Sequence, residues 1–151
     1  MAELPSRRRW LRAIVLLAAG ALAACGADDR EARRQAAGAN PGLPQLLAVA
    51  KPDAGRRLFG QCAACHTIGR GAGHRAGPNL HAILGRPIAG DPRYGYTAAL
   101  EARGGRWTVE AMDAWLQSPA RFAPGTKMNY PGMADPLDRA DMIAYLRAAG
   151  E

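Results

Sequence analysis

The sequence is poor in aromatic residues, which make up 6% of its 151 residues, so side chains alone fill only a lean core. It has no internal repeat, no low-complexity tract and no glycine-rich phosphate-binding loop. Segments of alternating apolar and polar residues are also absent, which argues against β-strands and favours an all-α fold. With 18 glycines and 11 prolines the chain is rich in loops, and we expect something besides side chains to fill its middle.

The apolar run near the start, residues 13–24, has only 12 residues, fewer than the roughly 20 that a membrane-spanning helix needs. It follows a basic segment and precedes Cys25, so residues 1–24 are predicted to be an export signal peptide. The tetrapeptide Leu22-Ala23-Ala24-Cys25 resembles a bacterial lipobox, in which the cysteine becomes the first residue and carries a diacylglycerol. An ordinary signal peptidase site in residues 21–23 is the alternative.

The net charge is partly a property of the signal peptide. Removing residues 1–24, with four arginines and one glutamate, lowers the formal net charge from +7 to +4. Nucleic acid is therefore not an expected partner, and we expect a lipid-anchored protein on the periplasmic side of a bacterial membrane. Residues 25–50 are predicted to be the lipidated Cys25 and a flexible linker, within which residues 43–50 could form a short helix. The functional domain is predicted at residues 51–151.

Helix signals in this domain predict three to five helices. A helix is expected to begin at Pro52 or Asp53, and another to cover residues 108–118, where Pro119 stops it. A third is expected after Asp135, with Pro136 at its first position, and a short one near residues 97–102 is an option. Glycine and proline mark the segments between these helices as irregular loops.

The motif CAACH, residues 62–66, holds Cys62 and Cys65 three residues apart with His66 directly after them. Two thiols at this spacing can close a disulfide, hold zinc, exchange thiols or bind haem covalently. Zinc would need further ligands, for which only His74 and His81 are left. A redox dithiol usually lies where a strand meets a helix, and no strand is predicted. Haem attachment accounts for all three residues, with two thioethers and a proximal histidine ligand to the iron.

The second axial position of the iron decides between electron transfer and catalysis. The candidates are Met112, Met128, Met133, Met142, His74, His81 or no residue at all. Met112 and Met142 lie at helical-face spacing, which is typical of core residues. Met128 is favoured because it follows His66 by 62 residues, in a proline- and glycine-rich loop that can reach the opposite haem face. Met133 occupies the same loop and remains its competitor.

From Asp53 to Ala148 the chain resembles a class I cytochrome c of the mitochondrial type. The motifs CAACH, AGPNLHAILGR, YT, PGTKM and DMIAYLR follow in that family's order. The resemblance implies a cytochrome c fold around one covalent haem c, with Met128 as the distal ligand. It also implies that the carbonyl of Pro78 accepts a hydrogen bond from His66 and thereby fixes the imidazole ring.

The resemblance assigns further residues around the haem. Arg86, Trp107, Thr126 and Tyr94 correspond to the groups that hold the haem propionates. Trp115 stands where the family usually has a tyrosine near the methionine sulfur, so the polarity there differs. Gly55 and Phe59 on the first helix, with Tyr145 on the last, resemble the close helix contact of this fold.

A histidine and a methionine together leave the iron no vacancy for a substrate, so this ligand set predicts a one-electron carrier and not an enzyme. Arg75, Arg121 and Lys127 are predicted to form a docking patch that steers an acidic redox partner. Such a partner would be a quinol-oxidising complex, a terminal oxidase or a periplasmic dehydrogenase, and the protein itself would be a monomer. The alternatives are a dedicated cytochrome subunit of a membrane-bound dehydrogenase or oxidase, and a peroxidase-like haem enzyme.

Overall fold

The structure is a computed structural model that describes residues 27–151. The predicted signal peptide and Cys25 lie outside this range. The chain divides into two units, residues 1–36 and residues 37–151. The described residues contain no helix whose length and apolar character would let it cross a membrane.

Residues 25–50, predicted to be a flexible linker, contain two helices. In α2 (Ala27–Ala37), Arg33 pairs with Asp29 at 3.7 Å, and Gln35 donates to Glu31 at 3.3 Å. Pairs four residues apart stabilise a helix, which explains why this charged segment is helical. The short helix α3 (Leu43–Ala48) belongs to the second unit and packs on the last helix, so that unit begins well before residue 51.

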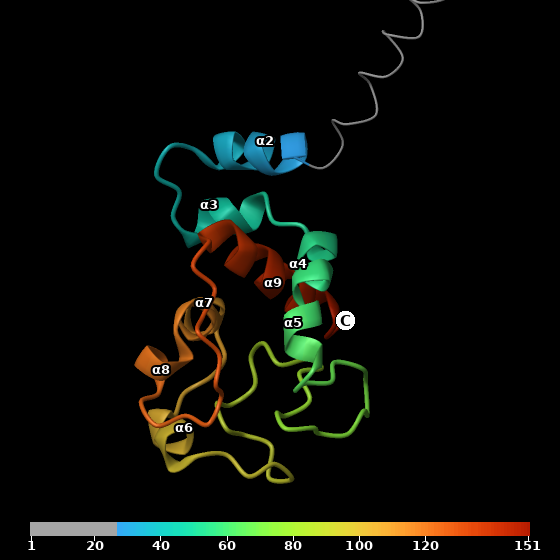
Figure 1. The fold of residues 1–151 in the computed structure, drawn as a ribbon, viewed down its shortest axis with the longest axis vertical. Helices are drawn as coiled ribbons and strands as arrows, with labels where there is room; N and C mark the ends of the chain where they lie inside the picture. Colours follow the sequence, from blue (N-terminus) through green and yellow to red (C-terminus); the bar gives the residue numbers. More distant parts are fainter. Residues whose placement is uncertain (1–26) are drawn as a thin grey trace, which may run out of the picture. The chain divides into compact units, whose positions relative to one another are not determined.

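The second unit is all-α, as predicted, and its described residues contain no β-strand (Figure 1). The four helices expected from the sequence are all present: α4 (Pro52–Leu58), α6 (Ala98–Arg103), α7 (Val109–Gln117) and α9 (Pro136–Ala148). The two additional helices, α5 (Gly60–Ala63) and α8 (Pro119–Phe122), have four residues each. So short a helix shows no apolar periodicity, which is why neither was expected from the sequence.

Each main helix begins where a side chain or a proline caps it. Thr97 accepts a hydrogen bond from the backbone N–H of Leu100, and Thr108 accepts one from that of Ala111. The carboxylate of Asp135 accepts from the N–H of Leu137 at 2.9 Å, with Pro136 at the first helical position. These contacts satisfy N–H groups that have no partner within their own helix.

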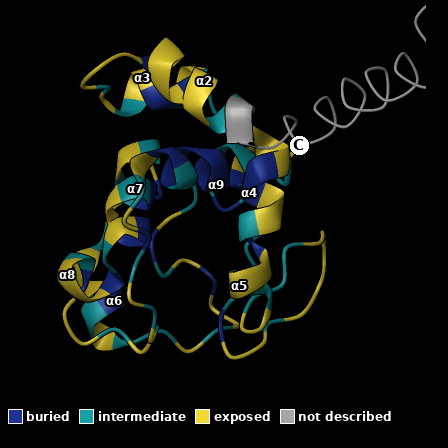
Figure 2. Ribbon diagram, turned by 45° about the horizontal axis from the view of Figure 1, so that its top comes forward, coloured by how far each residue is buried: buried dark blue, intermediate teal, exposed yellow. Residues whose placement is uncertain are grey.

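The first and last helices of the domain, α4 and α9, pack tightly against each other. Gly55 makes this contact possible, because a side chain there would overlap the backbone carbonyl of Asp141 and the Cβ of Tyr145. One turn further along α4, the rings of Phe59 and Tyr145 meet with centroids 5.3 Å apart. The predicted helix contact is therefore present, and α9 has more buried residues than any other described helix (Figure 2).

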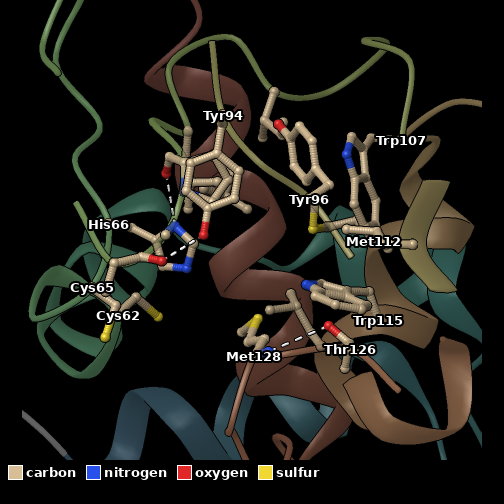
Figure 3. Close-up of a pocket in the computed structure, with 18 of the residues that line it drawn as sticks. Cys62, Cys65, His66, Tyr94, Tyr96, Trp107, Met112, Trp115, Thr126 and Met128 are labelled. Carbon is tan, nitrogen blue, oxygen red and sulfur yellow. Dashed lines mark hydrogen bonds between the residues drawn. The ribbon is translucent and has the colours of Figure 1, made fainter. Parts of the chain in front are cut away.

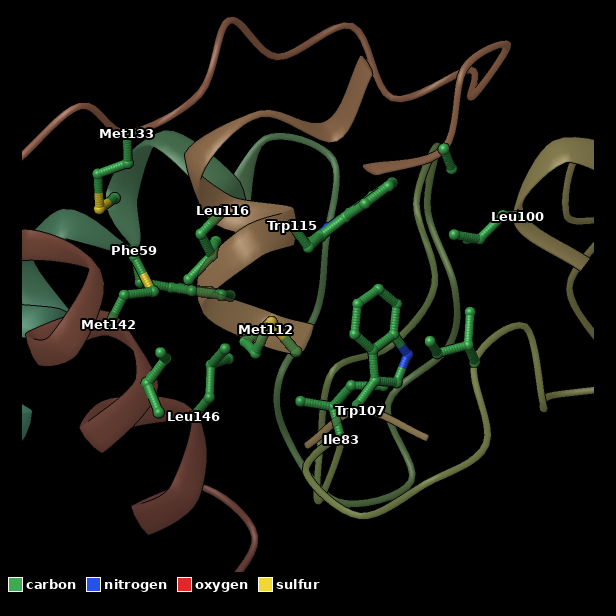
Figure 4. Packing of buried hydrophobic residues seen from close by; sticks show 13 residues of the cluster. Phe59, Ile83, Leu100, Trp107, Met112, Trp115, Leu116, Met133, Met142 and Leu146 are labelled. Carbon is green, nitrogen blue, oxygen red and sulfur yellow. The ribbon is translucent and has the colours of Figure 1, made fainter. Parts of the chain in front are cut away.

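The core continues from α9 to α7 and then into a group of aromatic rings (Figure 4). The rings of Trp107, Trp115 and Phe122 lie with centroids 5.5–5.7 Å apart. An ion pair joins the middle of α7 to α9, where the nearly buried Arg139 donates to Asp113 at 2.7 Å. The same guanidinium donates to two backbone carbonyls, of residues 133 and 134, and so fixes the segment that precedes α9.

The contact at Gly55 can be tested by substitution. We expect Gly55→Ala to lower the free energy of unfolding by about 1–3 kcal/mol, because one helix must move to accommodate the methyl group. Gly60→Ala is the matched control, since Gly60 is helical too and a methyl group there meets nothing within 4 Å. Denaturant unfolding of the two variants measures the difference, and equal stabilities would show that α4 and α9 do not depend on this close approach.

Candidate functional site

A cleft in the second unit contains about 1070 Å³ of empty space, part of which is open to solvent. Its wall brings together residues far apart in sequence, from α4 to α7, from α9 and from the loops between them. Most of the lining is apolar, with Trp107, Met112 and Trp115 on one side (Figure 3). Such a cleft fits a large, mostly apolar ligand with a few polar anchors.

The two cysteines of the CAACH motif lie on this wall at the end of α5. The backbone N–H groups of Cys65 and His66 both donate to the carbonyl of Cys62, at 3.0 and 2.9 Å, which holds the motif in a tight turn. The cysteines are not joined in a disulfide, and burial, with the neighbouring Cys65, raises the pKa of the Cys62 thiol. No group of three or more metal-ligating side chains occurs among residues 27–151, which leaves the zinc hypothesis without support.

His66 is held in one orientation by the chain that follows it. Its Nδ1 lies 2.8 Å from the carbonyl oxygen of Pro78, which confirms the predicted hydrogen bond. A carbonyl can only accept, so Nδ1 carries the proton and Nε2 keeps its lone pair for a ligand or a metal. Burial lowers the pKa of His66, although the bond to Pro78 opposes this effect, so the ring is neutral.

Gly77 gives the imidazole its space. A side chain at this position would overlap three ring atoms of His66, while the backbone N–H of Gly77 donates to the carbonyl of Cys65 at 2.7 Å. The loop therefore passes directly against the ring that it orients.

Of the candidates for the second axial position, Met128 lies on the cleft wall and its side chain points into the cleft (Figure 3). Its backbone N–H donates to the hydroxyl of Thr126 at 3.3 Å. Met112 and Met142 are core residues, as expected, and they also border the cleft. His74 and His81 are not among the lining residues.

Met133, the competitor of Met128, lies elsewhere. It is 6% exposed, belongs to the core near Phe59 and Leu116, and is not among the cleft-lining residues (Figure 4). Its backbone N–H donates to the carbonyl of Leu116 at 2.8 Å, which holds it there. Geometry thus favours Met128, whose role as an iron ligand stays a prediction.

The residues predicted to hold propionates are only partly brought together. Trp107, Thr126 and Tyr94 line the cleft, as does Trp115, but Arg86 does not. The guanidinium of Arg86 instead lies 3.4 Å from the carboxylate of Asp91.

Sequence reasoning missed two kinds of residue at the site. Tyr96 lines the cleft, and the motif YT that contains it was the signal that could have identified it. Asp91, whose carboxylate is nearly buried, belongs to no recognised motif, so no local signal indicated its position.

The three residues of the predicted docking patch have different surroundings. Lys127 borders the cleft with its ammonium 4.5 Å from the ring centroid of Tyr94. Arg75 donates to the carbonyl of Ala63, between the two cysteines, at 2.6 Å. Arg121 lies exposed on α8. Their role as one patch stays a prediction.

The sequence was compared with known proteins. The family model described as cytochrome c matches residues 52–150. The cytochromes c of Cannabis sativa and Ginkgo biloba are 44% and 40% identical over 95 and 99 residues, which are 62% and 65% of this chain and 86% and 88% of theirs. A cytochrome c homolog of Rickettsia bellii (strain RML369-C) is 38% identical over 105 residues, 70% of this chain and 61% of its own length.

The packing of Gly77 on His66 provides a test of the site. We expect Gly77→Ala to displace the imidazole, lower the free energy of unfolding by about 1–3 kcal/mol and shift the Soret band of the haem-loaded protein. Gly73→Ala is the control in the same loop, because a methyl group there meets nothing within 4 Å. Absorption spectra and denaturant unfolding of both variants are the measurements. If Gly77→Ala keeps the parent spectrum, His66 does not depend on this loop.

Proposed function

Because the chain belongs to the cytochrome c family, whose members carry electrons on haem c, we propose that it serves a periplasmic electron-transfer chain while a lipid on Cys25 tethers it to the membrane. The observation that carries the proposal is the arrangement of the cleft, where a neutral, oriented His66 and the thioether of Met128 both border one apolar space.

The residues present fit haem c. Cys62 and Cys65 lie at the wall where thioether bonds to the macrocycle would form, and Nε2 of His66 is free to bind iron. When bound, haem supplies an iron that alternates between the ferric and ferrous states by one electron. His66 and Met128 would hold the iron, and the apolar wall would exclude water from its surroundings. Methionine as the second ligand raises the reduction potential relative to a second histidine.

The composition of the wall supports a carrier over a peroxidase-like enzyme. Among the described residues that line the cleft there is no carboxylate, and His66 is the only imidazole. Haem peroxidase chemistry needs a general acid and base on the distal side of the iron. The wall offers Met128 and the indole of Trp115 instead.

The length of the tether bears on the alternative of a dedicated subunit. The domain begins at residue 37, so only residues 26–36 separate it from Cys25, and most of them belong to α2. A helix of this length spans about 16 Å, less than the flexible chain expected from the sequence would reach. A short tether restricts the distance over which the domain can travel, which favours exchange with a partner fixed nearby in the membrane.

The distal ligand is tested by an absorption spectrum. We expect the ferric haem-loaded protein to show the weak far-red band of iron bound to thioether sulfur, and Met128→Ala to lose it. Met133→Ala is the matched control, because Met133 lies in the core and not on the cleft wall. A band that persists in Met128→Ala, or disappears only in Met133→Ala, contradicts this ligand assignment.

The tether is tested by replacing the lipidated thiol. We expect Cys25→Ser to move the haem-loaded protein from the membrane fraction to the soluble periplasmic fraction, with an unchanged absorption spectrum, because lipid and haem are bound at separate sites. Mass spectrometry of the mature parent should show a diacylglycerol on its first residue. A parent that is soluble and begins at another residue would indicate ordinary signal peptidase cleavage.

A further inference from the structure

The nearly buried carboxylate of Asp91, behind the cleft wall, faces three cationic or titratable side chains. Its side chain is 5% exposed, and its oxygens lie 3.0 Å from Arg93, 3.4 Å from Arg86 and 3.6 Å from Nε2 of His74. Hydrogen bonds from Arg93 keep the pKa of Asp91 well below its usual range, so the carboxylate stays charged at neutral pH. A nearly buried charge of this kind costs free energy unless it is paired.

Asp91 also makes two hydrogen bonds within its own loop. The backbone N–H of Arg93 donates to one carboxylate oxygen at 3.1 Å, and the N–H of Tyr94 donates to the carbonyl of Asp91 at 3.1 Å. They form a turn that many aspartates stabilise. The contact with His74 is different, because it joins residues 17 positions apart on separate loops.

His74 belongs to the segment that orients His66. Its Nδ1 accepts a hydrogen bond from the backbone N–H of Asn79 at 3.0 Å, directly after Pro78. Since Nδ1 accepts, the neutral ring carries its proton on Nε2, the nitrogen that faces Asp91. A continuous set of contacts thus runs from Asp91 through His74 and Asn79 to the carbonyl that binds His66.

We propose that Asp91 is a positioning residue for the proximal side of the cleft, which fixes the loop of residues 67–81 through His74 and thereby the hydrogen bond from His66 to Pro78. The inference rests on the proposed function, since it assumes that His66 binds the iron. A second tie between the same loops supports the arrangement, because the hydroxyl of Tyr94 donates to the carbonyl of Ala76.

The alternative is a purely local role, in which Asp91 only shapes its own turn with Arg93. The two roles differ in which backbone amides become exposed when the carboxylate is removed. The N–H groups of Gly77 and Leu80, both in the 67–81 loop, donate to the carbonyls of Cys65 and Thr67 at 2.7 and 2.8 Å. They report on this loop without involving His74 directly.

The test is hydrogen exchange and potentiometry on the full, haem-loaded chain carrying Asp91→Asn, alone and combined with His74→Asn. We expect Asp91→Asn to speed exchange at Gly77 and Leu80 about tenfold, while amides of α9 keep their rates. In the His74→Asn background the same substitution should have little further effect on these two amides. The reduction potential should rise, because a looser bond to Pro78 makes His66 a weaker electron donor to the iron.

Asp113→Asn is the matched control, since it breaks an ion pair with Arg139 far along the chain from the 67–81 loop. We expect it to leave exchange at Gly77 and Leu80 unchanged. Equal exchange rates at Gly77 and Leu80 in Asp91→Asn and the parent overturn the proposal. Faster exchange at Tyr94 alone also overturns it. So does a tenfold effect of Asp91→Asn that persists in the His74→Asn background. If Asp91→Asn does not fold, His74→Asn alone must give the tenfold change. The far-red band separately reports whether Met128 binds the iron, so a failure of the proposed function is distinguishable.

Discussion

The close approach of α4 to α9 at Gly55 is the constraint on which the rest of the domain depends. It joins the two ends of the region from residue 52 to residue 148, and everything between them becomes loops and short helices around one cleft. Asp141 of α9 strengthens the junction, because its buried carboxylate accepts from the backbone N–H of Lys51 at 2.7 Å, where α4 begins. The short helix α5, with Cys62 in it and Cys65 just after it, follows α4, so this contact also sets where the haem is attached.

From this junction the chain builds the two sides of the site by different means. On the side of His66, backbone groups orient the imidazole ring, because the carbonyl of Pro78 binds it and Gly77 leaves space for it. On the side of Met128, the loop is fixed where it returns to α9, by Arg139 and its hydrogen bonds to two backbone carbonyls. The side chain of His66 is therefore oriented directly, whereas the loop that carries Met128 is fixed at residues 133 and 134. We therefore expect local opening on the side of Met128 before the side of His66.

Local sequence signals predicted the features that local contacts produce. The CAACH motif, the helices near residues 97–102, 108–118 and after Asp135, and Pro136 at a helix start all depend on signals within a few residues, so they could be read directly. The hydrogen bond at Pro78 and the helix contact at Gly55 were foreseen only through the resemblance to a known family. Arg86 was placed at the cofactor by the same resemblance, but the carboxylate of Asp91 lies beside it in this chain.

Most features that the sequence did not predict depend on contacts between residues that are distant along the chain. A charged residue is most often solvated, so the burial of Asp91 and of Arg139, which pairs with Asp113, could not be foreseen without the fold. The position of Met133 in the core was hidden for the same reason, since it shares a loop with Met128 and differs from it only in tertiary contacts. The helix α2 was not predicted because its segment has a composition typical of linkers, whereas α3 lies within residues 43–50, which could form a short helix according to the sequence.

In the proposed function, His66 and Met128 fill both axial positions of the iron, so the protein carries electrons and leaves the iron no position for a substrate. Exposing the reduced, haem-loaded protein to carbon monoxide near neutral pH tests this claim most directly, because the gas binds ferrous haem only at an open position. We expect the absorption spectrum of the reduced, haem-loaded protein to stay unchanged in carbon monoxide. Rapid formation of a carbon monoxide adduct would contradict it and would return an open iron, and with it enzyme chemistry, to the cleft.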